Sequence, residues 1–107
     1  MKMVLAIVSH DDSNKVQKAL VNEKFFATKL SSTGGFLSKG NTTFMIGCED
    51  ELVEKAIEVI SEHCKSRKKI VPNSLVSEYG MFSNQMIEVS VGGATIFVLD
   101  VAQFKKI

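Results

Sequence analysis

The residues best suited to bind a ligand surround a glycine pair in the first third of the chain. Glycines mark residues 33–41, Thr-Gly-Gly-Phe-Leu-Ser-Lys-Gly-Asn, as a loop. Backbone N–H groups at Gly34 and Gly35 can turn toward one point, which suits a phosphate, and the Phe36 ring can stack on a planar base. Neutral groups that fit the edges of a nucleobase surround the loop: Thr28, Thr33, Asn41, Thr42 and Thr43. The segment suits a nucleotide, and a plain hairpin turn explains its glycines equally well.

The two histidines give little evidence for a metal site or for catalysis. His10 is followed by Asp11 and Asp12, but one histidine beside two acids is a poor metal signature, and Asp12 and Ser13 are good helix caps. His63 is expected late in a helix, where its charge is favourable. The sequence has no P-loop, GxSxG or HExxH pattern and no nucleophile beside an evident base. We therefore expect no catalytic residue, no metal and no cofactor.

The charge balance argues against binding to nucleic acid polymers or to membranes. The 13 basic and 12 acidic residues leave a net charge of +1, which is too small for nonspecific attraction to polyanions. The basic run Lys65–Lys69 suits the carboxyl end of a helix, where cations are favourable and solvated. A second basic pair, Lys105-Lys106, is close enough to the end of the chain to fold over a neighbouring site.

Cysteine usage and the first residues indicate a cytoplasmic protein. Cys48 and Cys64 form no CxxC pair, so we expect both to be reduced and partly buried. The apolar run Met3–Val8 is too short for the core of a signal peptide or for a membrane span, and it suits a buried strand. A length of 107 residues, 45% of them hydrophobic, fits a single domain over residues 1–107.

Hydrophobic periodicity predicts alternating strands and helices. Strands are expected at Lys2–Ser9, Phe25–Ser31, Thr42–Gly47, Met86–Val91 and Ala94–Val101. Gly92-Gly93 makes the last two either a pair of strands joined by a tight turn or one strand with a bulge. One helix is expected after the caps Asp12 and Ser13. Another is expected after Glu49-Asp50-Glu51, with a buried stripe of Leu52, Val53, Ala56, Ile57, Val59, Ile60 and Cys64. Residues 71–84 are expected to form a long functional or mobile connection, with a short extended piece near Asn73–Val76.

This order predicts an α+β fold, a ferredoxin-like βαββαβ sandwich with an antiparallel sheet, both helices on one face and a long mobile loop. The other face of the sheet has no helix to cover it. The strand that holds Phe44, Met45 and Ile46 is nevertheless apolar on both faces. A second copy of the chain is the simplest cover for that face.

Three segments closely resemble the PII-like cyclic di-AMP receptor proteins: MKMVLAIV, ATKLSSTGGFLSKGNTTFMIG and EVSVGGATIFVLDVAQF. The resemblance runs over nearly the whole chain at the same spacing. It implies a PII-like homotrimer that holds cyclic di-AMP in clefts between subunits. It also implies that two loops change their order on binding and signal to an unknown downstream protein. The implied ligand-contacting residues are Thr28, Gly35, Phe36, Leu37, Asn41, Gly47 and Phe97.

Two positions depart from the family pattern. The family commonly has an arginine where this chain has Phe26, and an asparagine where it has Lys24. An arginine pairs firmly with a phosphate, whereas a phenylalanine offers only a ring that stacks on a base. Lys24 or Lys106 is a candidate for the replacement cation.

Three other functions remain open from the sequence. A PII-like sensor of ATP or ADP would share the scaffold, although the conventional T-loop of PII proteins is not recognisable. An RNA-binding module shares the βαββαβ order but needs exposed aromatics on its central strands, where Phe44 is the candidate. An acylphosphatase-like hydrolase needs a loop arginine near an asparagine, and the single arginine of this chain is Arg67, in the basic run.

Overall fold

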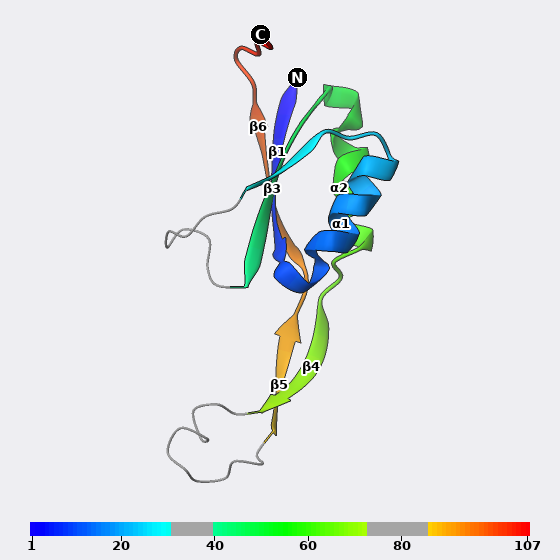
Figure 1. Cartoon of the computed structure of the whole chain (residues 1–107), viewed down its shortest axis with the longest axis vertical. Helices are drawn as coiled ribbons and strands as arrows, with labels where there is room; N and C mark the ends of the chain where they lie inside the picture. The colour runs from blue at the N-terminus through cyan, green and yellow to red at the C-terminus, as the bar shows by residue number, and fades with distance from the viewer. Residues whose placement is uncertain (31–39, 73–85) are drawn as a thin grey trace.

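The computed structural model describes residues 1–30, 40–72 and 86–107, which form a body of one sheet and two helices with a projecting arm (Figure 1). The elements are β1 (Lys2–Ser9), α1 (His10–Asn22), β2 (Ala27–Leu30), β3 (Asn41–Cys48), the 3-10 turn η1 (Asp50–Leu52), α2 (Val53–Glu62), β4 (Arg67–Pro72), β5 (Met86–Val91) and β6 (Ala94–Asp100). Within these ranges, no helix has the length and apolar character needed to cross a membrane.

Four strands form an antiparallel sheet in the order β2-β3-β1-β6, and both helices cover one of its faces (Figure 1). The most apolar strand, β1, lies inside the sheet, where Val4 pairs with Ile46 of β3 on one side and with Val98 of β6 on the other. A strand flanked on both sides and covered by helices is expected to be a continuous apolar run. The predicted α+β fold with βαββαβ order is confirmed.

The core lies between the sheet and the helices. Alternate residues of β1 and β3 face the helices because side chains alternate along a strand, and these residues are buried. The largest fully buried side chains in this layer include Val4, Val8, Val16, Leu20, Phe44, Ile46 and Ile60. Leu52 was predicted to lie in the buried stripe of the second helix, but it is 46% exposed because it belongs to η1, before α2 begins.

Helix α1 begins at His10, earlier than the predicted caps. Ser9 occupies the N-cap position, and its side chain makes no capping hydrogen bond. The Ser13 hydroxyl donates to the carbonyl oxygen of His10 at 2.8 Å, inside the first turn. The prediction that Asp12 and Ser13 cap the helix was wrong, since the Asp12 carboxylate is buried in an ion pair with Arg67.

Strands β4 and β5 form a separate antiparallel pair, the arm, that projects from the end of the body (Figure 1). The prediction that Lys65–Lys69 ends a helix was wrong, because α2 stops at Glu62 and Arg67 already begins β4. Residues 71–72, expected in the long connection, belong to the same strand. Residues 73–85, including the extended piece expected near Asn73–Val76, lie outside the described residues.

Gly92 and Gly93 carry the chain from the arm into the body. The strands on either side of them are separate, as one alternative predicted, but they do not form a hairpin: β5 pairs with β4, and β6 pairs with β1. Both glycines have positive φ, +83° at Gly92 and +76° at Gly93. A Cβ atom on Gly92 would lie 2.6 Å from the Lys65 carbonyl oxygen and 2.6 Å from Arg67 Nη1, so this position requires glycine.

Candidate ligand-binding site

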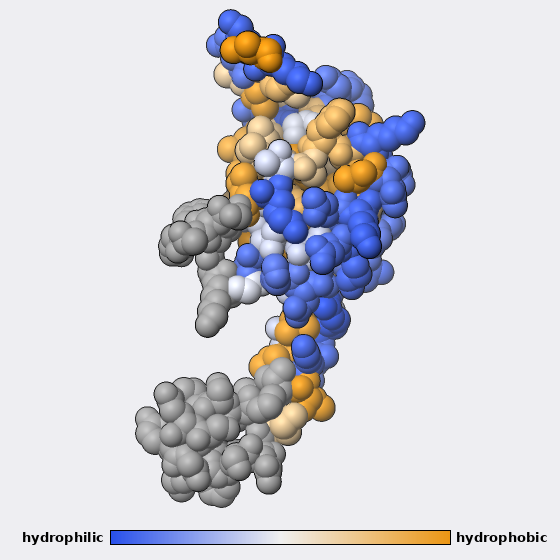
Figure 2. Space-filling view, viewed as in Figure 1, coloured by the Kyte–Doolittle hydropathy of each residue, from blue (hydrophilic) through white to orange (hydrophobic). Residues whose placement is uncertain are grey.

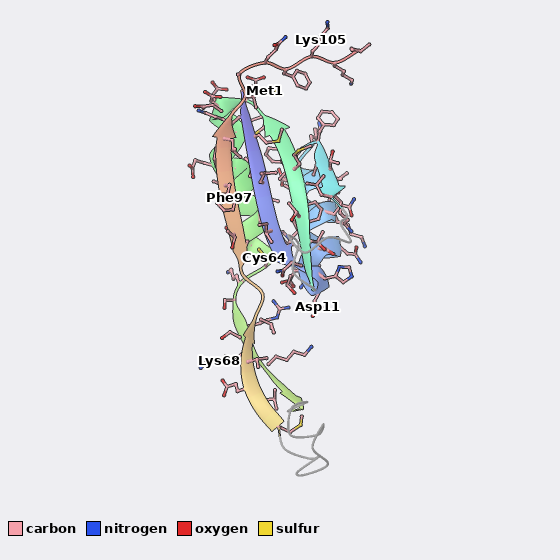
Figure 3. The ribbon with its side chains drawn as sticks, turned by 90° about the vertical axis from the view of Figure 1, so that its left-hand side faces the viewer. Met1, Asp11, Cys64, Lys68, Phe97 and Lys105 are labelled. Carbon is pink, nitrogen blue, oxygen red and sulfur yellow. The ribbon has the colours of Figure 1, made fainter. Side chains whose placement is uncertain are left out.

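The helix-free face of the sheet, on which Figure 3 labels Phe97, carries four of the residues expected to contact a ligand. Phe44 of β3 points into the core, so the odd-numbered residues of β3 lie on the opposite face. The strand register puts Thr28 of β2, Asn41 and Gly47 of β3, and Phe97 of β6 on that face. The other three expected contacts, Gly35, Phe36 and Leu37, lie outside the described residues.

Thr28 and Phe97 lie in one row across the sheet but far from each other. Thr28 pairs with Met45, Met45 with Leu5, and Leu5 with Phe97. Three strand spacings of about 4.8 Å separate Thr28 from Phe97 by about 14 Å. Within one chain, the structure therefore does not bring Phe97 into the same site as Thr28.

A pocket of about 680 Å³ lies near the end of the sheet where the chain starts and β6 ends. Four segments form its walls: the first residues of the chain, the segment from Lys24 to Thr28, the end of β3 with the turn that follows, and the segment after β6. Its size falls in the range of pockets that hold small molecules. The pocket includes Thr28 and Gly47 among the expected contacts, but it includes neither Asn41 nor Phe97.

The pocket combines cations with exposed aromatic rings. Its basic side chains are Lys24, Lys105 and Lys106, and its one acidic side chain is Glu49. Phe26 is 88% exposed and Phe104 is 65% exposed, so both rings are free to stack on a planar group. Ammonium groups attract phosphates, and aromatic rings suit purines, so the pocket can hold an anionic nucleotide. The basic pair Lys105-Lys106, expected to cover a neighbouring site, lines the pocket of its own chain.

Lys24 adopts the left-handed conformation, with φ +65°, and no other non-glycine residue in the described ranges has a positive φ. The Lys24 N–H donates to the carbonyl oxygen of Val21, and the Phe25 N–H donates to that of Leu20, each at 2.9 Å. These bonds close the end of α1. The resulting turn buries Phe25 in the core and leaves Phe26 exposed in the pocket wall.

Thr43, one of the neutral groups expected around the glycine loop, is not among the contacts that the family resemblance implies, but its surroundings make it a candidate contact. Its side chain lies on the helix-free face of β3, beside Leu30 of β2, and is 6% exposed. Among the described residues its hydroxyl oxygen has no hydrogen-bond partner. Because an unpaired buried hydroxyl is unfavourable, Thr43 is suited to bond a ligand or a second chain that lies against this face.

In the wall formed by the last residues, Lys105 and Lys106 were candidates from the sequence, but Val101 and Phe104 were not. Val101 is held beside the start of the chain by a hydrogen bond from its N–H to the carbonyl oxygen of Met1, at 3.3 Å. This contact brings Phe104, Lys105 and Lys106 to the pocket. The only sequence signal for this wall was the basic pair itself, because a pairing between the two ends of a chain leaves no local pattern.

Two charged groups near the pocket and both cysteine thiols have pKa values shifted from their ordinary values. The α-ammonium group of Met1 lies 2.9 Å from Asp50 Oδ1, and this hydrogen bond raises the pKa of the ammonium and lowers the pKa of the Asp50 carboxyl. Burial raises the pKa of the Cys48 thiol in the pocket wall, and that of Cys64 in the core. Both cysteines are free and buried, and a raised pKa keeps them unreactive at neutral pH.

The histidines make local hydrogen bonds. His10 Nδ1 lies 3.1 Å from the Thr42 hydroxyl, and His63 Nδ1 lies 2.8 Å from the carbonyl oxygen of Val59. In the part of the chain that the structure describes, no group of three or more His, Cys, Asp or Glu side chains is arranged to hold a metal ion.

The RNA-binding alternative loses its candidate aromatic. Phe44 is fully buried against the helices, so it cannot stack on a base. Arg67, on which the hydrolase alternative depended, is paired with Asp12 at the foot of the arm.

Comparison with known proteins identifies the family. A family model described as cyclic-di-AMP receptor matches residues 1–107. The crystal structure of a functionally unknown protein from Pediococcus pentosaceus ATCC 25745 is similar to this chain, with a TM-score of 0.74 and 40% sequence identity over 99% of this chain and 96% of that one. The chain therefore belongs to the cyclic-di-AMP receptor family, which consists of non-catalytic signalling proteins.

Proposed function

We propose that this chain is a cytoplasmic receptor that forms a homotrimer and binds cyclic di-AMP in the clefts between subunits. Binding changes the order of two loops, at residues 31–39 and 73–85, and this change signals to a partner protein. The observation that carries the proposal is the pocket that joins Thr28 and Gly47 to three lysines and two exposed rings. Cyclic di-AMP presents two phosphates and two adenines, which need cations, stacking surfaces and polar edges.

The separation of Thr28 from Phe97 supports a site shared between subunits. About 14 Å of sheet lies between them in one chain, and the pocket that contains Thr28 does not include Phe97. A neighbouring subunit packed against the same face supplies its own Phe97 from the other direction. Both residues then serve as ligand contacts, as the family resemblance implies.

The helix-free face supports the trimer. Phe97 is 54% exposed and Leu99 is 45% exposed, and both lie on this face beside Leu5 and Met3 of β1. Figure 2 shows hydrophilic residues over the helices and hydrophobic residues along the opposite edge of the body. An apolar sheet face of this kind is stable in water when another copy of the chain covers it.

Isothermal titration calorimetry with cyclic di-AMP tests the ligand, with ATP and cyclic di-GMP as controls and light scattering of the same sample to give the oligomeric state. We expect binding of one cyclic di-AMP per subunit of a trimer. Thr28→Val removes the pocket hydroxyl at nearly constant size and should weaken binding by about tenfold. Ser61→Ala, which removes an exposed hydroxyl on α2, on the other side of the sheet, is the control and should leave affinity unchanged. A folded trimer that binds ATP but not cyclic di-AMP would replace this proposal with the ATP-sensor alternative.

A further inference from the structure

The first turn of α1 touches two distant parts of the chain. The His10 N–H donates to the carbonyl oxygen of Gly40 at 2.7 Å, and His10 Nδ1 lies 3.1 Å from the Thr42 hydroxyl. Both partners lie where the chain returns from residues 31–39 into β3. Two residues after His10, the Asp12 carboxylate binds Arg67, the first residue of the arm. One turn of helix therefore contacts both the end of the glycine loop and the foot of the arm.

The contact between Asp12 and Arg67 is bidentate. Arg67 Nη2 lies 3.0 Å from Asp12 Oδ1, and Arg67 Nη1 lies 3.2 Å from Asp12 Oδ2. Asp12 is fully buried, and Lys15 Nζ, 3.5 Å from Oδ1, is its second cation. The hydrogen bonds from Arg67 lower the pKa of the Asp12 carboxyl, so the pair stays charged at neutral pH. A buried carboxylate depends strongly on such a partner, whereas the half-exposed Arg67 can turn to water when the pair is broken.

Both strands of the arm are fixed at the same place. Arg67 Nη1 also donates to the carbonyl oxygen of Lys65 at 3.3 Å, where β4 begins. The Gly93 N–H donates to the carbonyl oxygen of Cys64, where β5 has just ended. Gly92 lies so close to Arg67 that no side chain fits between them. Figure 3 shows Asp11 and Cys64 at this end of the body, with Lys68 on the arm beyond them. The junction therefore joins the arm to α1 through Arg67.

The arm depends on its junction for support. In the described residues, β4 and β5 form a two-stranded sheet that pairs with no other strand. An isolated two-stranded pair is marginally stable in water, so a small change at its support shifts how often the arm opens. Exposed apolar side chains of the arm, Ile70 at 66% and Met86 at 53%, are consistent with an element that is not held by packing against the body.

We propose that the first turn of α1 couples the glycine loop to the arm, with His10 bound to the loop end and Asp12 bound to Arg67. This inference rests on the proposed function, in which ligand binding changes the order of residues 31–39, the loop that leads into Gly40. A shift of Gly40 and Thr42 is passed to His10, and the same rigid turn carries Asp12 and the arm with it. The coupling works in both directions, so a partner that holds the arm also changes ligand affinity.

Hydrogen exchange of the β4 and β5 amides, with and without cyclic di-AMP, tests the coupling in the full chain. Asp12→Asn keeps the size of the side chain and removes its charge, and it should speed exchange in the arm about tenfold without ligand. In the wild type, cyclic di-AMP should change arm exchange severalfold, and Asp12→Asn should abolish that response while ligand still binds. Lys68→Gln is the matched control, because Lys68 pairs with Glu88 inside the arm at 3.4 Å and has no ion pair with α1. It should leave the response intact.

The outcomes separate the two proposals. If the wild type binds no cyclic di-AMP, the proposed function is wrong and the ligand coupling fails with it. If ligand binds and arm exchange does not change, or changes equally in Asp12→Asn, the function stands and the coupling is overturned. The double variant Asp12→Asn/Arg67→Gln removes both charges of the bidentate pair and leaves only the exposed Lys15 without its partner, so it provides the same test where Asp12→Asn does not fold. His10→Gln tests the other contact and should also reduce the response.

Discussion

Replacing Lys24 with glycine should stabilise the protein and weaken ligand binding at the same time. Lys24 follows α1 with φ +65°, at a position where glycine commonly ends a helix. A left-handed conformation costs an L-residue about 1–2 kcal/mol, and the greater backbone freedom of glycine in the unfolded chain cancels about 0.5–1 kcal/mol of the gain. The net gain in the free energy of unfolding is about 0.5–1 kcal/mol, or about 2–4 °C in Tm for a chain of this size.

Ligand binding should change in the opposite direction. Lys24 lines the pocket with Lys105 and Lys106, where it replaces the asparagine common in the family. Removing one charge-assisted hydrogen bond to a phosphate should weaken cyclic di-AMP binding by about tenfold. Glycine relieves the backbone strain at position 24 and also removes the ammonium group. The free energy of unfolding should therefore rise while the affinity for cyclic di-AMP falls.

Thermal denaturation at fixed protein concentration and calorimetry with cyclic di-AMP measure the two effects. Lys24→Ala is the control, since it removes the charge and keeps the strained backbone; its Tm should match the wild type and its affinity should match Lys24→Gly. A lower Tm for Lys24→Gly than for Lys24→Ala would refute the role of backbone strain. Unchanged affinity in both variants would show that Lys24 makes no contact with the phosphate.

Three further changes test other parts of the structure. Gly40→Ala adds backbone strain, since φ is +94°, and no atom of the described residues lies within 4 Å of the new Cβ, whereas Gly92→Ala adds a steric clash as well. In urea denaturation, Gly40→Ala should cost about 1–2 kcal/mol and Gly92→Ala roughly 3 kcal/mol or more, and equal losses would contradict the crowded junction. Thr43→Val removes a buried hydroxyl that has no partner in the described residues, so it should raise the free energy of unfolding by about 1 kcal/mol without ligand; a loss would mean that the hydroxyl is bonded. The pKa of Asp12 is below its ordinary value of about 3.9, so its stabilisation is present above about pH 4 and lost as pH falls through the folded pKa. Asp12→Asn should therefore flatten the fall in urea midpoint below about pH 4, and an equally steep fall would contradict the ion pair.

The body of the fold was predictable because its strands and helices bury one face each. The apolar run at Lys2–Ser9 and the stripe from Val53 to Ile60 leave periodic patterns that any packed element requires. In the arm, β5 was predicted at Met86–Val91 but β4 was not, because the basic residues of Arg67–Pro72 resemble the end of a helix and the strand pairs, in the described residues, with β5 alone. Asp12 was misassigned as a helix cap for a related reason. Its partner Arg67 is 55 residues away in the sequence, and the residues next to Asp12 indicate only that a helix begins there.

The candidate site was predictable only in part. Family resemblance pointed to Thr28 and Gly47, and both lie in the pocket. The wall formed by Phe104 depends on a contact between the two ends of the chain, so no spacing within a segment reveals it. The left-handed conformation of Lys24 was equally hidden, since lysine has no preference for it.

Three departures from ordinary packing support a binding role independently of the family resemblance. Lys24 holds a strained backbone, Phe26 exposes nearly its whole ring, and Thr43 buries a hydroxyl that has no partner in the described residues. Each of these is unfavourable in an isolated chain, and elements that only maintain a fold rarely keep such features. A base on Phe26 and a polar group at Thr43 would relieve two of these features, whereas the strained turn at Lys24 holds an ammonium group beside the pocket for a phosphate. These features are what the proposed function requires of a single chain, in which the ligand and a second subunit would complete the site.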